Sequence, residues 1–286
     1  MPENGEEKKM KKFLVLIVFA MIIIFVLSCG NEKKSSGYEL ALITDVGTID
    51  DRSFNQGSWE GLKKYAEEKG ITHKYYQPTE KTTDAYIDSI DLAVAAGAKI
   101  VVTPGFLFEP AIYKAQDIHP EVNFVLLDGS PQDGNYQDFR IEKNVYSVFY
   151  AEEEAGFLAG YGAVKEGYTN LGFMGGMAVP AVVKFGYGFV QGVNYAAKEL
   201  GIKNVKVDYN YLGGFNPSPE IQTKAASWYR NGVQVIFVAG GGAGNSVMSA
   251  AEQNNGYVIG VDVDQSSESP TVITSAMKMI GESVYN

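Results

Sequence analysis

The feature of this sequence that most constrains its fold is an alternation of short apolar runs with amphipathic stretches, and this alternation occurs twice. In the first series, strand-like runs at residues 40–44, 73–77, 100–103 and 124–127 alternate with helical stretches at 53–69, 84–96 and 109–118. In the second series, runs at 171–174, 205–211, 235–238 and 258–261 alternate with stretches at 181–200, 220–231 and 245–254. Such alternation predicts parallel sheets with right-handed crossovers, so two series indicate two α/β lobes.

The two lobes are expected to span residues 38–145 and 146–286. Residues 131–150 are irregular and are the expected first crossing between the lobes, and a helix at 151–164 then opens the second lobe. A body of about 250 residues is long enough for two lobes with cores of their own.

The N-terminal region predicts export and a lipid anchor. Lysines at positions 8, 9, 11 and 12 precede an uncharged apolar run at 13–27, which ends at Ser28 and Cys29. This order is typical of a secretory signal peptide, and the apolar run is shorter than the roughly 18–20 residues that span a bilayer. Residues 26–29 resemble a lipobox, so we expect a signal peptide at 1–28, lipid attachment at Cys29 and a flexible polar tether at 29–37. An uncleaved membrane anchor is the alternative, and translation from Met10 would leave a cleaner signal.

Composition argues against several classes of function. The formal net charge is −10, which disfavours binding to nucleic acid or to anionic lipid by charge alone. Cys29 is the only cysteine, the only histidines are His73 and His119, and no Gly-x-Ser-x-Gly motif is present. The sequence therefore gives no metal site, no cofactor site and no catalytic residue, and an enzyme is disfavoured.

Nearly every predicted strand ends in glycine, aspartate or an aromatic residue. These ends are residues 44–47, 103–106, 127–130, 174–176, 212–215, 238–242 and 261–264. In parallel sheets ligands bind beyond the carboxyl ends of the strands, so these residues predict a cleft for a small polar molecule with a flat part. The glycine run at 240–244 lacks the third glycine of a dinucleotide motif and the lysine of a P-loop, so a turn that lines the cleft is favoured. The acidic run at 152–154 is interpreted as first-turn charges that stabilise a helix N-terminus.

Ordered motifs resemble one protein family. Residues 44–56, with the sequence TDVGTIDDRSFNQ, are similar to the first-strand motif of the basic membrane protein family of lipoproteins, which includes the purine nucleoside receptor lipoproteins. Matching features follow in order at residues 127–128, 184–192, 238–241, 260–265 and 274–278. The resemblance covers nearly all of residues 38–285.

The resemblance implies a type I periplasmic-binding-protein fold, in which two doubly wound parallel-sheet lobes are joined by hinge crossovers. It also implies a substrate-binding protein of an ABC importer that captures purine nucleosides. Carried over by position, Phe54 and Phe185 would sandwich the base, Asp45, Asn55 and Asp128 would bind its edges, and Gly240, Asp262 and Lys278 would hold the ribose. Each aromatic stack is worth roughly 1–3 kcal/mol, and a carboxylate with a lysine suits a diol. A core position is the alternative for each phenylalanine.

The expected partners are a purine nucleoside, an ABC permease and ATPase, and a bacterial membrane held through Cys29 on the extracytoplasmic side. We expect a monomer without nucleic acid. Alternatives are the same fold binding a pentose, a nucleobase or a furanone, a sensor ectodomain, a surface adhesin, or a nucleoside hydrolase. Family members usually extend roughly one βα unit further than residue 286, so the second lobe is expected to be incomplete.

Overall fold

The structure, a computed structural model, describes residues 39–45 and 47–286. The predicted signal peptide, the tether and Cys29 lie outside these residues. The first series of elements is β1 (Leu40–Ile43), α2 (Phe54–Lys69), β2 (His73–Tyr76), α3 (Thr83–Ala95), β3 (Ile100–Pro104), η1 (Phe106–Phe108), α4 (Glu109–Ile118), β4 (Asn123–Leu127) and β5 (Val145–Val148). The second is α5 (Glu152–Lys165), β6 (Asn170–Gly175), α6 (Pro180–Leu200), β7 (Lys206–Tyr211), α7 (Pro219–Arg230), β8 (Val235–Ala239), α8 (Ala243–Asn254), β9 (Tyr257–Asp262), β10 (Val272–Met277) and α9 (Ile280–Tyr285).

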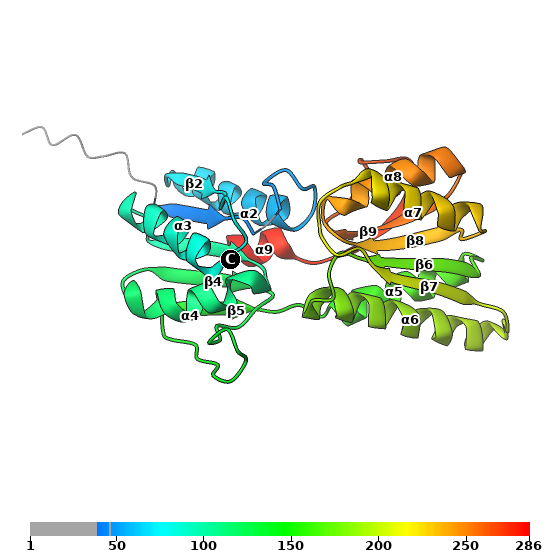
Figure 1. Ribbon diagram of the computed structural model, residues 1–286, viewed down its shortest axis with the longest axis horizontal. Coiled ribbons are helices and arrows are strands. Elements are labelled where there is room, and N and C mark those ends of the chain that lie inside the picture. The colour runs from blue at the N-terminus through cyan, green and yellow to red at the C-terminus, as the bar shows by residue number, and fades with distance from the viewer. Residues whose placement is uncertain (1–38, 46) are drawn as a thin grey trace, which may run out of the picture. The chain divides into compact units, whose positions relative to one another are not determined.

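The strands form two parallel sheets with the same internal order (Figure 1). The first sheet has the order β2-β1-β3-β4-β5, and the second has the order β7-β6-β8-β9-β10 when it is followed in the same sense. We call the first sheet with its helices the first lobe, and the second sheet with its helices the second lobe. The predicted α/β fold with two parallel-sheet lobes is confirmed.

Two strands were not predicted, and both lie at a sheet edge. β5 pairs with β4 inside the segment expected to be the irregular crossing, so the first sheet continues past residue 145 to Val148. β10 pairs with β9 at the edge of the second sheet. Most side chains of both strands are exposed or half-buried, because edge strands have a neighbour on one side only. Their apolar signal in the sequence is correspondingly weak.

Each sheet is covered by helices on both faces. Along β1, Leu40 and Leu42 pack towards α2, whereas Ala41 and Ile43 pack into the core under α3 and α4. Side chains alternate in the same way along β8, towards α5 and α6 on one face and α7 and α8 on the other. This period of two is what a buried parallel strand requires. Among residues 39–45 and 47–286, no helix has the length and apolarity needed to cross a membrane.

The chain crosses between the sheets twice, and each crossing delivers a helix to the opposite lobe. The crossing after β5 leads to α5, which packs along α6, and the crossing after β10 leads to α9, which packs along α2 (Figure 1). Glycines permit both helix pairs to approach closely. A Cβ at Gly160 of α5 would overlap the carbonyl oxygen of Phe189, and one at Gly61 of α2 would overlap that of Gly281.

Candidate functional site

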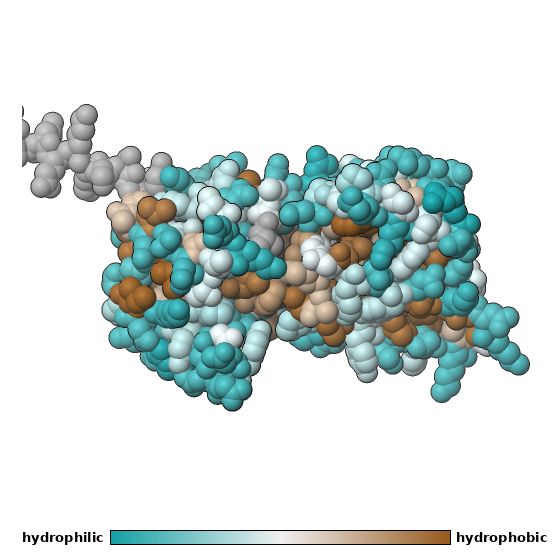
Figure 2. Space-filling view, viewed as in Figure 1, coloured by the Kyte–Doolittle hydropathy of each residue, from teal (hydrophilic) through white to brown (hydrophobic). Residues whose placement is uncertain are grey.

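A cavity of about 380 Å³ lies where the carboxyl ends of the two sheets face each other. Figure 2 shows apolar residues in the hollow between the lobes and hydrophilic residues over most of the surrounding face. The cavity is lined by all eight residues that the sequence singled out for ligand binding, namely Asp45, Phe54, Asn55, Asp128, Phe185, Gly240, Asp262 and Lys278. They follow different strands, and the parallel topology brings them together.

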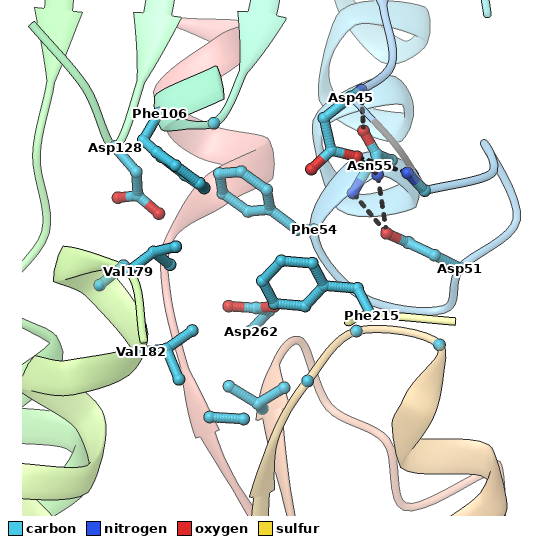
Figure 3. Close-up of a pocket in the computed structure, with 18 of the residues that line it drawn as sticks. Asp45, Asp51, Phe54, Asn55, Phe106, Asp128, Val179, Val182, Phe215 and Asp262 are labelled. Carbon is cyan, nitrogen blue, oxygen red and sulfur yellow. Dashed lines mark hydrogen bonds between the residues drawn. The ribbon is translucent and has the colours of Figure 1, made fainter. Parts of the chain in front are cut away.

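Asp45 and Asn55 form a polar corner in the first lobe (Figure 3). The Asn55 amide nitrogen donates to Asp45 Oδ1 at 2.9 Å and to Asp51 Oδ2 at 3.0 Å, and its oxygen accepts from the Asp45 backbone nitrogen at 3.3 Å. Both amide hydrogens are therefore committed, which fixes the orientation of the side chain. Burial raises the pKa of Asp45, against the lowering effect of hydrogen bonds from Asn55 and from Gly47. The corner presents acceptor oxygens to the cavity.

Asp51 holds the start of α2 in place. Ser53 occupies the N-cap position, yet its side chain makes no capping bond. The Asp51 carboxylate instead accepts backbone N–H bonds from Ser53 at 2.9 Å, Asn55 at 3.0 Å and Gln56 at 3.0 Å. Burial raises the pKa of Asp51 to about 6, although these bonds lower it. The first two helical residues, Phe54 and Asn55, are thereby fixed at the cavity.

Three half-buried rings surround the cavity, from Phe54, Phe106 and Phe215 (Figure 3). Phe54 and Phe106 belong to the first lobe, and Phe215 follows β7 in the second. Phe185 also lines the cavity, but it is only 2% exposed and packs edge-on against Phe237 with ring centroids 5.8 Å apart. The core position that was the alternative for Phe185 is therefore where most of its ring lies, and Phe215 offers the more accessible face.

Neighbouring glycines and one backbone hydrogen bond fix the position of Phe215. A Cβ at Gly176 would overlap its ring, so the turn after β6 admits Phe215 only because residue 176 is glycine. The carbonyl oxygen of Phe215 accepts from the backbone nitrogen of Ala243 at 2.7 Å, at the start of α8. The sequence placed residue 215 at a strand end but did not identify its ring as a wall of the cavity, because these tertiary contacts leave no periodic pattern.

Lys278 is surrounded by carboxylates. Its ammonium group forms an ion pair with Asp128, and it lies 3.3 Å from Glu152 and 3.8 Å from Asp262. Burial alone would lower the pKa of Lys278, but the three carboxylates outweigh it and the pKa is raised. The ammonium nitrogen also lies 4.8 Å from the ring centroid of Phe54, which is cation–π geometry.

Asp128 and Asp262 occupy equivalent places in the two sheets. Asp128 follows β4 and Asp262 ends β9, and both have left-handed backbone conformations with φ of 55° and 67°. Non-glycine residues seldom adopt this conformation, so it marks a local constraint. The strand ends turn sharply there, and both carboxylates flank the same ammonium group.

Bonds between the lobes close one side of the cavity. Ser53 Oγ donates to Asp262 Oδ2 at 2.5 Å, and the Gln265 amide donates to the Arg52 carbonyl oxygen at 2.9 Å. Arg52 also forms an ion pair with Glu268. Because Asp51 caps α2, the Ser53 hydroxyl is free to reach the opposite lobe.

The remaining lining is glycine-rich backbone. Gly240, Gly241 and Gly242 follow β8 and line the cavity, as expected for a turn beside the cleft. Within the part of the chain that the structure describes, no cluster of histidine, cysteine and acidic side chains is arranged to hold a metal ion. The lining of the cavity offers aromatic rings, hydrogen-bonding groups and charged side chains.

Comparison with known proteins supports a binding role. The family described as ABC transporter substrate-binding protein PnrA-like (Bmp) matches residues 38–286. The ABC transporter nucleoside-binding protein BmpA of Lactococcus lactis subsp. cremoris is 30% identical, over 95% of this chain and 82% of that protein. Basic membrane protein A2 of Borrelia garinii subsp. bavariensis is 33% identical, over 96% of this chain and 79% of that protein.

Solved structures agree with the fold. The solute-binding protein of an ABC transporter system from Aeropyrum pernix K1 superposes with a TM-score of 0.74 at 26% identity, over 87% of this chain and 69% of that chain. The two parallel-sheet lobes thus have the type I periplasmic-binding-protein fold. With a family match over residues 38–286, the chain belongs to the Bmp family of PnrA-like ABC transporter substrate-binding proteins.

Proposed function

We propose that the chain captures purine nucleosides for an ABC importer. The observation that carries the proposal is the combination, in one cavity, of accessible aromatic rings, a corner of fixed acceptors and a carboxylate–ammonium cluster. A nucleoside has the matching parts, namely a flat base, polar base edges and a sugar diol. The name of the Lactococcus relative, a nucleoside-binding protein, points to the same ligand class.

The base stacks between Phe54 and a ring of the second lobe. The sequence named Phe185 for this place, and its burial leads us to assign the stacking to Phe215 instead. One ring comes from each lobe, so both faces of the base are covered when the lobes close. Each stack contributes roughly 1–3 kcal/mol to binding.

The base edge is bound by Asp45, Asn55 and Asp128. Both amide hydrogens of Asn55 are used within the protein, so Asn55 and Asp45 offer acceptors. Asp128 Oδ1 is buried and has no protein partner among the described residues. Acceptors of this kind suit a base edge with N–H donors, as in guanine or hypoxanthine.

The ribose is held by Asp262, Lys278 and the backbone at Gly240. A carboxylate accepts from a sugar hydroxyl, and an ammonium group donates to its oxygen. Five aspartates line the cavity, and Lys278 is the one lysine or arginine in its described lining; the aspartates are Asp45, Asp50, Asp51, Asp128 and Asp262. This excess of carboxylates favours a neutral nucleoside and repels the phosphate of a nucleotide.

We also propose that a lipid on Cys29 attaches the protein to the outer side of a bacterial membrane. The basic and apolar residues before Cys29 support this anchor. The variant Cys29→Ser tests this anchor. Loss of lipid mass and of membrane association in that variant is the expected result, and unchanged membrane association would contradict the anchor.

Calorimetric titration tests the ligand class directly. Guanosine, inosine and adenosine are compared with the free base guanine, with a pentose and with guanosine monophosphate. We expect nucleosides to bind more tightly than the other compounds, and to be recovered unchanged after long incubation. Tighter binding of the pentose, or hydrolysis of the nucleoside, would overturn the proposal. Native mass spectrometry of the protein as purified would identify a retained ligand by its mass.

A further inference from the structure

Glu152 is a buried carboxylate that the proposed ligand contacts do not use. It is only 2% exposed, and it is not among the residues that line the cavity. From the sequence, Glu152 was interpreted as one of three acidic residues in the first turn of a helix. Its neighbours Glu153 and Glu154 are exposed, as that interpretation requires, but Glu152 faces inward. A buried charge needs partners, since desolvation penalises it strongly.

The partners of Glu152 are two lysines from different parts of the chain. Its Oε1 lies 3.3 Å from the ammonium nitrogen of Lys278, and its Oε2 lies 3.2 Å from that of Lys184. Lys184 in turn donates to the carbonyl oxygen of Tyr150 at 3.3 Å. Burial would raise the pKa of Glu152, but the charges of Lys278 and Lys184, together with hydrogen bonding to the Asp128 side chain and to the backbone, lower it.

These contacts place Glu152 between the two crossings of the chain. It is the first residue of α5, directly after the crossing from the first sheet, and Lys278 begins the crossing from the second sheet. Lysine has a long, flexible side chain, and one partner would not fix its ammonium group. Asp128, Glu152 and Asp262 approach that group from three separate elements, and together they set its position.

We propose that Glu152 is a positioning residue that holds the Lys278 ammonium group where it meets the sugar of the ligand. The inference rests on the proposed nucleoside function, and it adds a residue outside the cavity to the ribose site. Glu152 also connects the sugar site, through ion pairs and a hydrogen bond, with the first crossing of the chain between the sheets. A hydroxyl bound to Lys278 is linked through Glu152 to the start of α5, and through Lys184 to Tyr150 in the first crossing.

The test compares Glu152→Gln with Glu153→Gln as the matched control. Glu153 is the next residue, its side chain is 47% exposed, and it lies 3.9 Å from Lys184 without a contact to Lys278. Both variants are titrated with guanosine and with 2′,3′-dideoxyguanosine, which keeps the base but lacks both hydroxyls. We expect Glu152→Gln to weaken guanosine binding about tenfold or more, the effect of losing a charged hydrogen-bond partner, and to change dideoxyguanosine binding far less. Glu153→Gln should change neither.

A double variant shows whether Glu152 acts through Lys278. In Lys278→Met protein, adding Glu152→Gln should not weaken guanosine binding further. Glu152→Asp, which keeps the charge, should restore part of the lost affinity, and it replaces Glu152→Gln if that variant does not fold. Equal losses for guanosine and dideoxyguanosine, or no loss at all, would overturn the inference while leaving nucleoside binding intact. Wild-type protein that binds no nucleoside would instead overturn the proposed function.

Discussion

The two lobes repeat one strand order but present different chemistry to the cavity. The first lobe contributes polar side chains held by many hydrogen bonds, with Asp45, Asp51 and Asn55 as its centre. The second lobe contributes glycine backbone at Gly240–242, apolar side chains at the start of α6, Phe215, and the charged residues Asp262 and Lys278. The same scaffold thus presents mainly hydrogen-bonded polar side chains in the first lobe, and apolar, aromatic and charged side chains beside glycine backbone in the second (Figure 3).

The comparison separates what the scaffold imposes from what the ligand requires. Asp128 and Asp262 occupy equivalent strand ends with the same left-handed backbone, so the scaffold is repeated down to this detail. The turn after β6 in the second lobe is equivalent to the turn that carries Asp45 in the first. It has glycine at residues 175–176, and a side chain at residue 176 would overlap the ring of Phe215. We infer that the first lobe binds the base edge, and that the second lobe covers the base and holds the ribose.

The largest expected effect is on stability, and it distinguishes a core ring, Phe185, from a ligand-facing ring, Phe215, in the second lobe. Phe185→Ala should lower the free energy of unfolding by about 3–5 kcal/mol, because Phe185 is buried against Phe237. Phe215→Ala should affect the stability much less, because that ring is only half-buried. Urea denaturation measures both, and equal losses would contradict the assignment of Phe215 to the ligand.

The next effect tests whether the lobes share the stacking. Phe54→Ala and Phe215→Ala should each weaken guanosine binding by about 1–3 kcal/mol, tenfold or more near the middle of that range. Calorimetry gives the affinities, with Phe139→Ala as a control on an exposed ring far along the first lobe. A large loss for one variant only would show that the stacking comes from a single lobe.

A smaller effect compares two glycines of one helix in the second lobe. Gly160→Ala should destabilise the protein by about 1–3 kcal/mol, because a Cβ there would overlap the Phe189 carbonyl oxygen. Gly162→Ala should stabilise it by up to about 1 kcal/mol, because a Cβ there would meet nothing within 4 Å beyond its own helix and alanine favours helix. Thermal unfolding distinguishes them, and a stabilising Gly160→Ala would refute the close packing of α5 on α6.

The smallest effect is a pH dependence that comes from carboxyl groups of the first lobe. Burial raises the pKa of Asp45, that of Asp51 to about 6 and that of Asp128 to about 7. A carboxyl group with a raised pKa loses its ionised form at a higher pH than an ordinary aspartate. Guanosine affinity should therefore begin to fall as the pH drops through about 7, where Asp128 is protonated, and fall further near 6. In Asp45→Asn protein, affinity should be lower at neutral pH and depend less on pH, and an unaltered pH profile would exclude Asp45 as the source.

Much of the fold and the cavity could be predicted from local patterns. The long βα series is periodic, and parallel topology places strand ends together, so the positions of Asp45, Asp128 and Asp262 followed from the sequence. Phe215 and Glu152 could not be assigned in this way. The seat of Phe215 depends on Gly176 and α8, and Glu152 looks like any first-turn acid until Lys278, far along the chain, meets it.

The exchange of helices at the two crossings has a consequence for how the protein is made. The glycine face of α2 is covered by α9, and the Tyr285–Glu68 hydrogen bond there joins residues 217 positions apart. On a ribosome or during export, residues of the first lobe emerge first, yet this face stays uncovered until the whole second lobe has followed. The first lobe is synthesised first but receives α9 only after β10, so shorter unfinished chains expose the glycine face of α2.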